Sequence, residues 1–228
     1  MAANKNINMG DAIGVISAFM GSNLRKRISD FEHAIKDCDG DKCRMKGIEA
    51  GITSDLLAAA YTVKAAAGQI NVLIHAAAIV LLIPKIIEPG EHIEYVSLGA
   101  GNAGREFDLE TNLRVAEFKF IHWQGGAESI RQNGVFKDFY TLAEADTKKR
   151  KELFVLGLDH PLRFLRGNRA MGSVLSKNAK LLKEFRDRYP QFTTVGQYYK
   201  FRENDVAVRD ASPLVPELLK VIDDVENP

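Results

Sequence analysis

Residues 105–121 read REFDLETNLRVAEFKFI, and the alternation of apolar and charged side chains in this stretch indicates the fold. Successive side chains of a β-strand point to opposite faces, so Phe107 and Leu109 share one face of a strand predicted over 105–110. The opposite face of this strand is acidic, with Glu106, Asp108 and Glu110. The stretch therefore predicts the first arm of a hairpin that carries carboxylates on one side.

The second arm, predicted over 113–122, places Glu117 and Lys119 on one face and the phenylalanines on the other. If Thr111 and Asn112 form a two-residue turn, residue 110 pairs with 113 and residue 108 with 115. Asp108 then lies diagonally from Glu117, at about 7 Å. Two carboxylates at that separation can hold one divalent cation, with the ammonium of Lys119 beside it. An odd-length turn would break this registry.

An acid followed by acid-x-lysine on a hairpin resembles the PD-(D/E)XK nuclease superfamily, and the resemblance covers residues 92–160. The order of predicted elements agrees with it: strands 92–98, 105–110 and 113–122, a helix over 128–145 and a strand over 152–158. One departure is Phe107, where the family often has proline. The resemblance implies an α/β fold, with a restriction-endonuclease-like mixed β-sheet core flanked by helices.

The resemblance also implies metal-assisted hydrolysis of phosphodiester bonds. It gives catalytic roles to Asp108, Glu117, Lys119 and Gln132. Mg²⁺, or alternatively Mn²⁺, would bind Asp108 and Glu117, because hard divalent cations prefer oxygen ligands. The family often takes another acid from its first core helix; Glu49 is the candidate here, with Asp55 an equal competitor.

Composition suits a globular chain that binds a phosphate backbone. The chain has 228 residues, 46% hydrophobic and 27% charged, with a net charge of +1. Its basic residues gather after residue 147, beside an acidic hairpin, which suits a ligand with a phosphate backbone. We expect nucleic acid as the partner, with DNA ahead of RNA. The predicted nucleic-acid-binding residues are Lys148, Lys149, Arg163, Arg166, Arg169 and Lys177. A solvated helix face would have the same composition.

Several features bear on organisation and location. Helical periodicity over 9–37 and a second helix over 54–83 predict an N-terminal helical extension (1–47) before a nuclease domain (48–228), with a homodimer through these helices as one option.

The apolar run 72–83 is shorter than the ~20 residues of an unaided span, so we expect a buried core helix and no stable membrane insertion. With no secretory signal visible and only Cys38 and Cys43, we expect a cytoplasmic protein with reduced thiols. Further helices are predicted over 170–189 and 216–225.

Three alternatives stay open. Residues 99–104 match G-x-G-x-x-G, but a dinucleotide site needs a helix to begin there, and the following residues alternate with period two. A non-catalytic nucleic-acid or protein-binding module could use the same fold. The long helices could also drive assembly, with the charged hairpin simply solvated.

Overall fold

The computed structural model describes residues 7–21, 23–99, 107–120, 123 and 128–219. The chain divides into two compact units, Met1–Asn71 and Val72–Pro228. The division falls within a long helix, and so differs from the boundary at 47/48 expected from sequence. Residues 100–106 lie outside the described residues, and with them most of the glycine-rich segment and the start of the strand predicted from 105.

The first unit contains α1 (Met9–Met20), α2 (Leu24–Ile35) and α3 (Gly40–Glu49), followed by the first part of α4. The continuous helix predicted over 9–37 is wrong, because the backbone turns at Gly21, whose positive φ of 53° ends α1. Arg27 then ties the pieces together by donating to the carbonyl oxygens of Phe19 and Ala50, at 2.8 and 3.0 Å.

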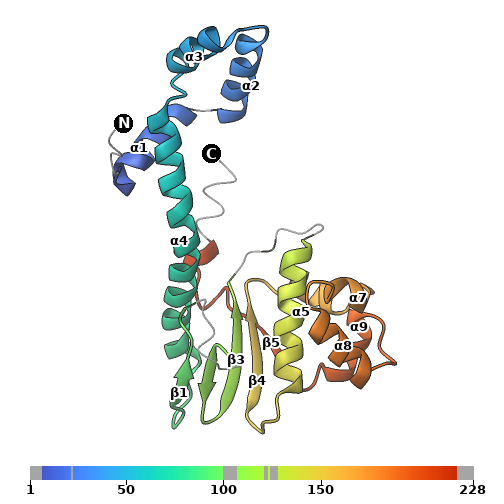
Figure 1. The fold of residues 1–228 in the computed structure, drawn as a ribbon. Helices are drawn as coiled ribbons and strands as arrows, with labels where there is room; N and C mark the ends of the chain where they lie inside the picture. Colours follow the sequence, from blue (N-terminus) through green and yellow to red (C-terminus); the bar gives the residue numbers. More distant parts are fainter. Residues whose placement is uncertain (1–6, 22, 100–106, 121–122, 124–127, 220–228) are drawn as a thin grey trace. The chain divides into compact units, whose positions relative to one another are not determined.

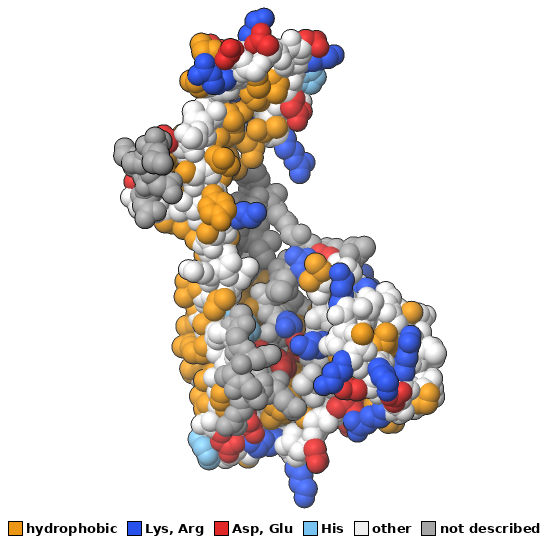
Figure 2. Space-filling view, in the orientation of Figure 1, with side chains coloured by type: hydrophobic (Ala, Val, Ile, Leu, Met, Phe, Trp, Pro, Cys, Tyr) orange, Lys and Arg blue, Asp and Glu red, His pale blue; other side chains and the backbone are white. Residues whose placement is uncertain are grey.

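Helix α4 (Ser54–Ile86) is longer than predicted and less buried. Only 17% of its most apolar stretch is buried, so the expectation of a buried core helix holds only for a stripe that includes Ile79 and Leu82. Orange side chains follow this helix in Figure 2. Among the described residues α4 is long and apolar enough to cross a membrane. The core helix of a soluble protein passes the same test of length and composition.

The second unit is built on a five-stranded mixed sheet in the order β1-β2-β3-β4-β5. Its strands are β1 (Ile93–Val96), β2 (Leu109–Thr111), β3 (Arg114–Lys119), β4 (Arg150–Val155) and β5 (Ala207–Asp210). The first three strands pair antiparallel, whereas β3, β4 and β5 pair in parallel. The α/β class and the mixed sheet flanked by helices are thus confirmed.

Each face of the sheet has its own core (Figure 1). Helix α5 (Ser129–Glu144), close to its predicted bounds, packs on one face against Val115, Leu153 and Val155. The second-unit part of α4 packs on the other face, where Ile79 and Leu82 join a cluster that includes Leu109, Ala116, Phe118 and Phe154. The period-two pattern therefore sorts the side chains of β3 as predicted: Val115 faces α5, and Phe118 faces α4.

Short helices cover the outer side of α5 and complete its core. They are α6 (Asp159–Leu165), α7 (Met171–Val174), α8 (Ala179–Arg188) and α9 (Val195–Arg202). The single helix predicted over 170–189 is wrong, because a turn separates α7 from α8. Helices α3, α6 and α9 and strand β5 were not predicted. Of the helix predicted over 216–225, residues beyond 219 lie outside the described part of the chain.

Candidate active site

The hairpin that carries the predicted acids turns one residue later than expected, which shifts the pairing of its two strands by two residues. Leu109 pairs with Ala116 and Glu110 with Val115, so Asn112 and Leu113 occupy the turn. The hydroxyl of Thr111 fixes this turn by accepting from the backbone N–H groups of Leu113 and Arg114, at 3.1 and 2.8 Å. A shift of two residues keeps every side chain on its predicted face, whereas a shift of one would not.

The corrected register brings Asp108 opposite Glu117 rather than diagonal to it. The two carboxyl groups act on each other, which lowers the pKa of Asp108 and raises that of Glu117. The Phe118 N–H donates to Oδ2 of Asp108 at 3.1 Å, and Nε2 of His75, from α4, lies 3.7 Å from the same oxygen. Three elements of the second unit therefore position this pair: the residue before β2, the end of β3 and one histidine of α4.

These contacts drive the two pKa values apart. Burial and the charges of Asp138 and Asp108 raise the pKa of Glu117 from 4.5 to about 9. Burial also acts to raise the pKa of Asp108, but hydrogen bonds from His75 and the Phe118 N–H outweigh it and hold that pKa below its ordinary value. At neutral pH, without a cation, the pair therefore keeps one proton on Glu117.

Lys119 follows Glu117 on the same face and meets α5. Its ammonium lies 2.8 Å from Oδ2 of Asp138, which is buried. Burial acts to lower the pKa of Lys119, but the charge and hydrogen bond of Asp138 raise it overall, so the side chain stays charged. Burial raises the pKa of Asp138 despite this ion pair. Three carboxyl groups and one permanent cation thus share a mostly buried region.

Gln132, the predicted catalytic residue of this helix, lies on a different side of α5 from Asp138. Asp138 lies on the face of α5 that also carries Arg131 and Gly134, residues spaced by three or four and thus on one side of a helix. Gln132 lies about 100° away around α5 from Arg131 and accepts a hydrogen bond from Arg169. The helix residue that touches the lysine is therefore Asp138.

Glu49 and Asp55, the competing third acids, both belong to the first unit and are exposed. Glu49 ends α3 and Asp55 lies in the first turn of α4. Their predicted role stays a prediction. The residue of α4 that reaches Asp108 is His75, two turns before the end of the buried stripe.

The predicted basic residues fall into two groups. Lys148 and Lys149 precede β4, at the end where Arg114 pairs with Arg150, roughly 16 Å along the strand from the Lys119 end. The ammonium of Lys149 is held by Glu94 and Glu110, at 2.6 and 2.8 Å. Lys148 and Lys149 therefore do not border Lys119.

The other group lies on the small helices that follow β4. Arg163 is in α6, Arg166 follows it and Lys177 lies between α7 and α8; all three are exposed. Arg169 reaches Gln132 of α5 and Ser173. Figure 2 shows Lys and Arg side chains spread over this helical region. The exposed side chains of Arg163, Arg166 and Lys177 are accessible to a phosphate backbone.

Sequence reasoning missed His75 and Asp138. His75 interrupts an apolar run, and a lone histidine there is usually structural. Asp138 interrupts the apolar face of α5 between Val135 and Phe139, and that break in the helical pattern was a usable signal. Among the described residues, no group of three or more His, Cys, Asp or Glu side chains is placed to hold a metal ion.

Comparison of the chain with models of known protein families, with curated proteins and with solved structures found no match. The fold and the arrangement of its residues therefore carry the functional argument.

Proposed function

We propose that this chain is a metal-dependent nuclease that hydrolyses phosphodiester bonds, with Asp108 and Glu117 as ligands of Mg²⁺ or Mn²⁺ and Lys119 as the catalytic cation. The observation that carries the proposal is the position of Asp108 opposite Glu117, beside the ammonium of Lys119, at one end of β3. We take DNA as the substrate, and the basic residues after β4 would bind its phosphate backbone.

The order of elements supports a restriction-endonuclease-like core. A helix (α4), three antiparallel strands (β1–β3), a crossover helix (α5) and a strand parallel to β3 follow one another along the chain. This is the order that the acid and acid-x-lysine pattern implies. The candidate residues also lie near the carboxyl end of β3, next to β4, and the carboxyl ends of parallel strands are where α/β proteins commonly bind ligands.

The charge of the region fits a divalent cation. Two carboxylates close enough to share a proton repel each other once both ionise, and a cation removes that cost. Mg²⁺ is typically held by one or two carboxylates and completes its shell with waters and substrate phosphates, so two acids suffice. A pKa of about 9 for Glu117 is the expected state of such a pair before a cation replaces its proton.

Each residue then has a distinct role. A bound Mg²⁺ would supply an acidified water and charge neutralisation at the phosphate. Asp108, oriented by the Phe118 N–H and His75, presents a fixed oxygen to the cation. Lys119 orients the attacking water and stabilises negative charge that develops on the phosphate. Asp138 holds the ammonium of Lys119 in place. Arg163, Arg166 and Lys177 bind the backbone without reading bases.

Incubation of the purified chain with plasmid, linear DNA and RNA in Mg²⁺ or Mn²⁺ tests the proposal. Wild type should produce cleaved DNA, and Asp108→Asn should produce none while keeping its fold by circular dichroism. The matched control is Glu110→Gln, which removes an acid two residues away on the same face of β2. Cleavage by Asp108→Asn at the wild-type rate would refute the assignment of the acids.

A second candidate function follows from α4. Large apolar side chains of this helix are exposed in both units, among them Leu57, Tyr61, Leu73 and Leu81. Such exposure favours assembly through the helix. If wild type cleaves no nucleic acid with any divalent metal but sediments as an oligomer that Leu73→Glu dissociates, assembly is the better account.

A further inference from the structure

A small pocket opens beside Lys119, on the α5 side of the sheet. Its volume is about 210 Å³. Its lining residues come from β3, β4, α5, α6 and the chain after β3: Lys119, Trp123, Ile130, Arg131, Gly134, Val135, Val155 and Pro161. Because Lys119 belongs both to this lining and to the candidate active site, any occupant of the pocket lies next to the proposed reaction.

The walls and the rim of the pocket differ in chemistry. The walls are mostly apolar, from residues such as Val135, Val155 and Pro161, with the indole of Trp123 among them. Trp123 is held in place by stacking on His160 and by contact with Phe164, with ring centroids 6.3 and 5.9 Å away. Among the lining residues that the structure describes, the cations are Lys119, which is paired with Asp138, and Arg131, which is paired with Glu128. An occupant that satisfies both features has an uncharged, apolar body joined to an anion.

We propose that this pocket receives one unpaired nucleobase of the substrate, next to the phosphate that Lys119 contacts. The proposal rests on the nuclease function and narrows its substrate class to single-stranded or locally unpaired nucleic acid. A base within a duplex is stacked on both sides and cannot enter a pocket unless it leaves the stack. An unpaired base has free faces for an aromatic wall, and such stacking needs no particular sequence.

Gly134 offers a direct way to fill the pocket. A Cβ at this position would lie 3.7 Å from Cε of Lys119, an ordinary contact, and the backbone of Gly134 is helical. Gly134→Leu should therefore fold, with some gain in helix propensity, and its side chain would occupy the space of the base. Ser129→Leu is the matched control, because it adds the same side chain to an exposed position of α5 outside the lining.

Trp123 gives a readout that does not depend on cleavage, since it is the single tryptophan of the chain. All variants would carry Asp108→Asn to prevent hydrolysis, with Mg²⁺ present. The probes are a short oligothymidylate, the same oligomer with every base replaced by an abasic tetrahydrofuran, and the oligothymidylate paired with oligodeoxyadenylate. The thymidylate and abasic oligomers carry the same number of phosphates on one strand, so a difference between these two reports the base.

Oligothymidylate should change the tryptophan fluorescence and bind about tenfold more tightly than the abasic oligomer, the scale of one base stacked on an aromatic side chain. Gly134→Leu should remove this preference, and Ser129→Leu should retain it. The duplex should bind without the fluorescence change. Equal binding of the thymidylate and abasic oligomers, or a preference that survives Gly134→Leu, would overturn the proposal.

The two proposals fail separately. If the wild-type chain cleaves duplex and single strands alike and ignores the base, the nuclease function stands and the base pocket is wrong. If oligothymidylate binds through its base but is never cleaved with Mg²⁺ or Mn²⁺, the pocket stands as a binding site and the nuclease function is wrong.

Discussion

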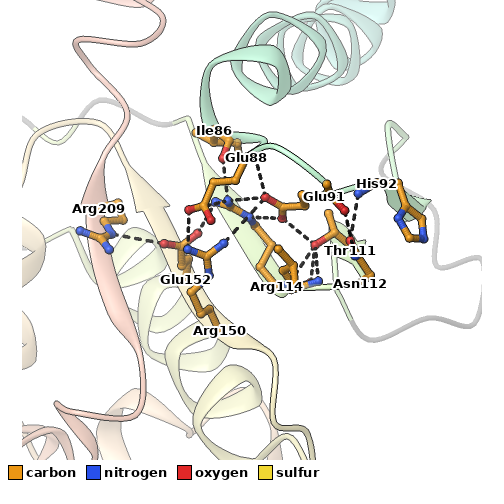
Figure 3. Close-up of polar contacts among 12 residues, drawn as sticks. Ile86, Glu88, Glu91, His92, Thr111, Asn112, Arg114, Arg150, Glu152 and Arg209 are labelled. Atoms are coloured by element: carbon orange, nitrogen blue, oxygen red, sulfur yellow. Dashed lines mark hydrogen bonds and ion pairs between the residues drawn. The ribbon is translucent and has the colours of Figure 1, made fainter.

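Charged side chains gather at both ends of β3, but the charges balance at only one end. At the Arg114 end, three carboxylates meet three guanidinium groups (Figure 3): Glu88, Glu91 and Glu152 with Arg114, Arg150 and Arg209. At the Lys119 end, the carboxyl groups of Asp108, Glu117 and Asp138 all act on the ammonium of Lys119.

The pKa values of two glutamates, Glu91 and Glu117, show what this difference in charge balance does. Hydrogen bonds from Arg114 hold the pKa of Glu91 down, to about 2, despite its burial. Burial and neighbouring carboxylates raise the pKa of Glu117 to about 9. A balanced cluster is complete without a ligand and serves the fold, whereas an unbalanced one leaves a place for a cation. The comparison teaches that charge balance, rather than burial alone, separates a structural cluster from a candidate site.

The largest effect should come from breaking the balanced end. Arg114 is 3% exposed and donates to Glu91, Glu152 and the carbonyl oxygen of Ile86. Arg114→Met leaves two buried carboxylates without their partner, so the free energy of unfolding should fall by about 3–5 kcal/mol. Urea denaturation measures this loss.

Arg209→Met is the control for that change, because Arg209 is largely exposed and touches Glu152 at 3.4 Å from the rim. Its cost should stay below about 1 kcal/mol. Equal losses for Arg114→Met and Arg209→Met would show that the buried network is not what holds this end of the sheet.

For Glu117, in protein without metal, we expect that removing the charged group stabilises the fold, whereas removing Arg114 destabilises it. Its folded pKa of about 9 exceeds its ordinary 4.5, so the native state binds more protons than the unfolded state between these values. Stability from this group is therefore complete below pH 4.5 and is lost as pH rises toward 9, by on the order of 1 kcal/mol per pH unit. Glu117→Gln stays neutral beside Asp108, Asp138 and Lys119, and should remove this decline.

Thermal melts of both proteins between pH 5 and pH 8, in a metal chelator, measure the difference. Adding Mg²⁺ or Mn²⁺ at pH 8 should raise the melting temperature of wild type but not of Glu117→Gln. A parallel pH dependence in the two proteins would show that Glu117 is not the group that titrates.

The sequence predicted the Lys119 end better than the Arg114 end. Period-two alternation assigns faces locally, so Glu117, Lys119 and Phe118 went to the correct sides of β3 even though the turn was misplaced by one residue and the pairing by two. The error came from Thr111, whose side chain bonds two backbone N–H groups and moves the turn to Asn112 and Leu113. Turn chemistry of this kind competes with the simple two-residue pattern.

What the sequence could not give were partners from distant elements. His75 and Asp138 approach the acids only because α4 and α5 pack on opposite faces of the sheet, and helix packing is not encoded in local spacing. The prediction of one continuous helix over 9–37 failed for a different reason. Gly21, with its positive φ, ends α1 inside a sequence whose apolar residues keep a helical spacing. Glu88, Glu91 and Glu152 read as ordinary surface acids until the fold gathers them around Arg114.

A smaller effect is expected from Lys119→Met, which makes the unbalanced end still more acidic. Losing one charged group that acts in the transition state should reduce cleavage by about 10²-fold, or about 2.7 kcal/mol. The change also leaves Asp138 buried without its cation, so some stability is lost. Adding Asp138→Asn should restore the melting temperature but not cleavage; recovery of both would make Lys119 a purely structural residue.

The smallest effect should come from the exposed basic side chains, which extend the comparison to the surface. Arg163 and Arg166 lie on and after α6, next to Pro161 of the pocket beside Lys119, whereas Lys148 lies at the Arg114 end of β4. On a single strand, each cation that neutralises a phosphate adds about 0.7 to the slope of log affinity against log salt. Arg163→Gln with Arg166→Gln should therefore lower the slope for single-stranded DNA by about 1.4 and weaken binding several-fold at low salt. Lys148→Gln should leave the slope unchanged, because a strand bound at the Lys119 end does not reach it. Titrations of labelled DNA at a series of salt concentrations measure all three proteins. If Lys148→Gln lowers the slope as much per charge as the arginine changes do, nucleic acid runs along both ends of the sheet, and the balanced end takes part in binding as well as in the fold.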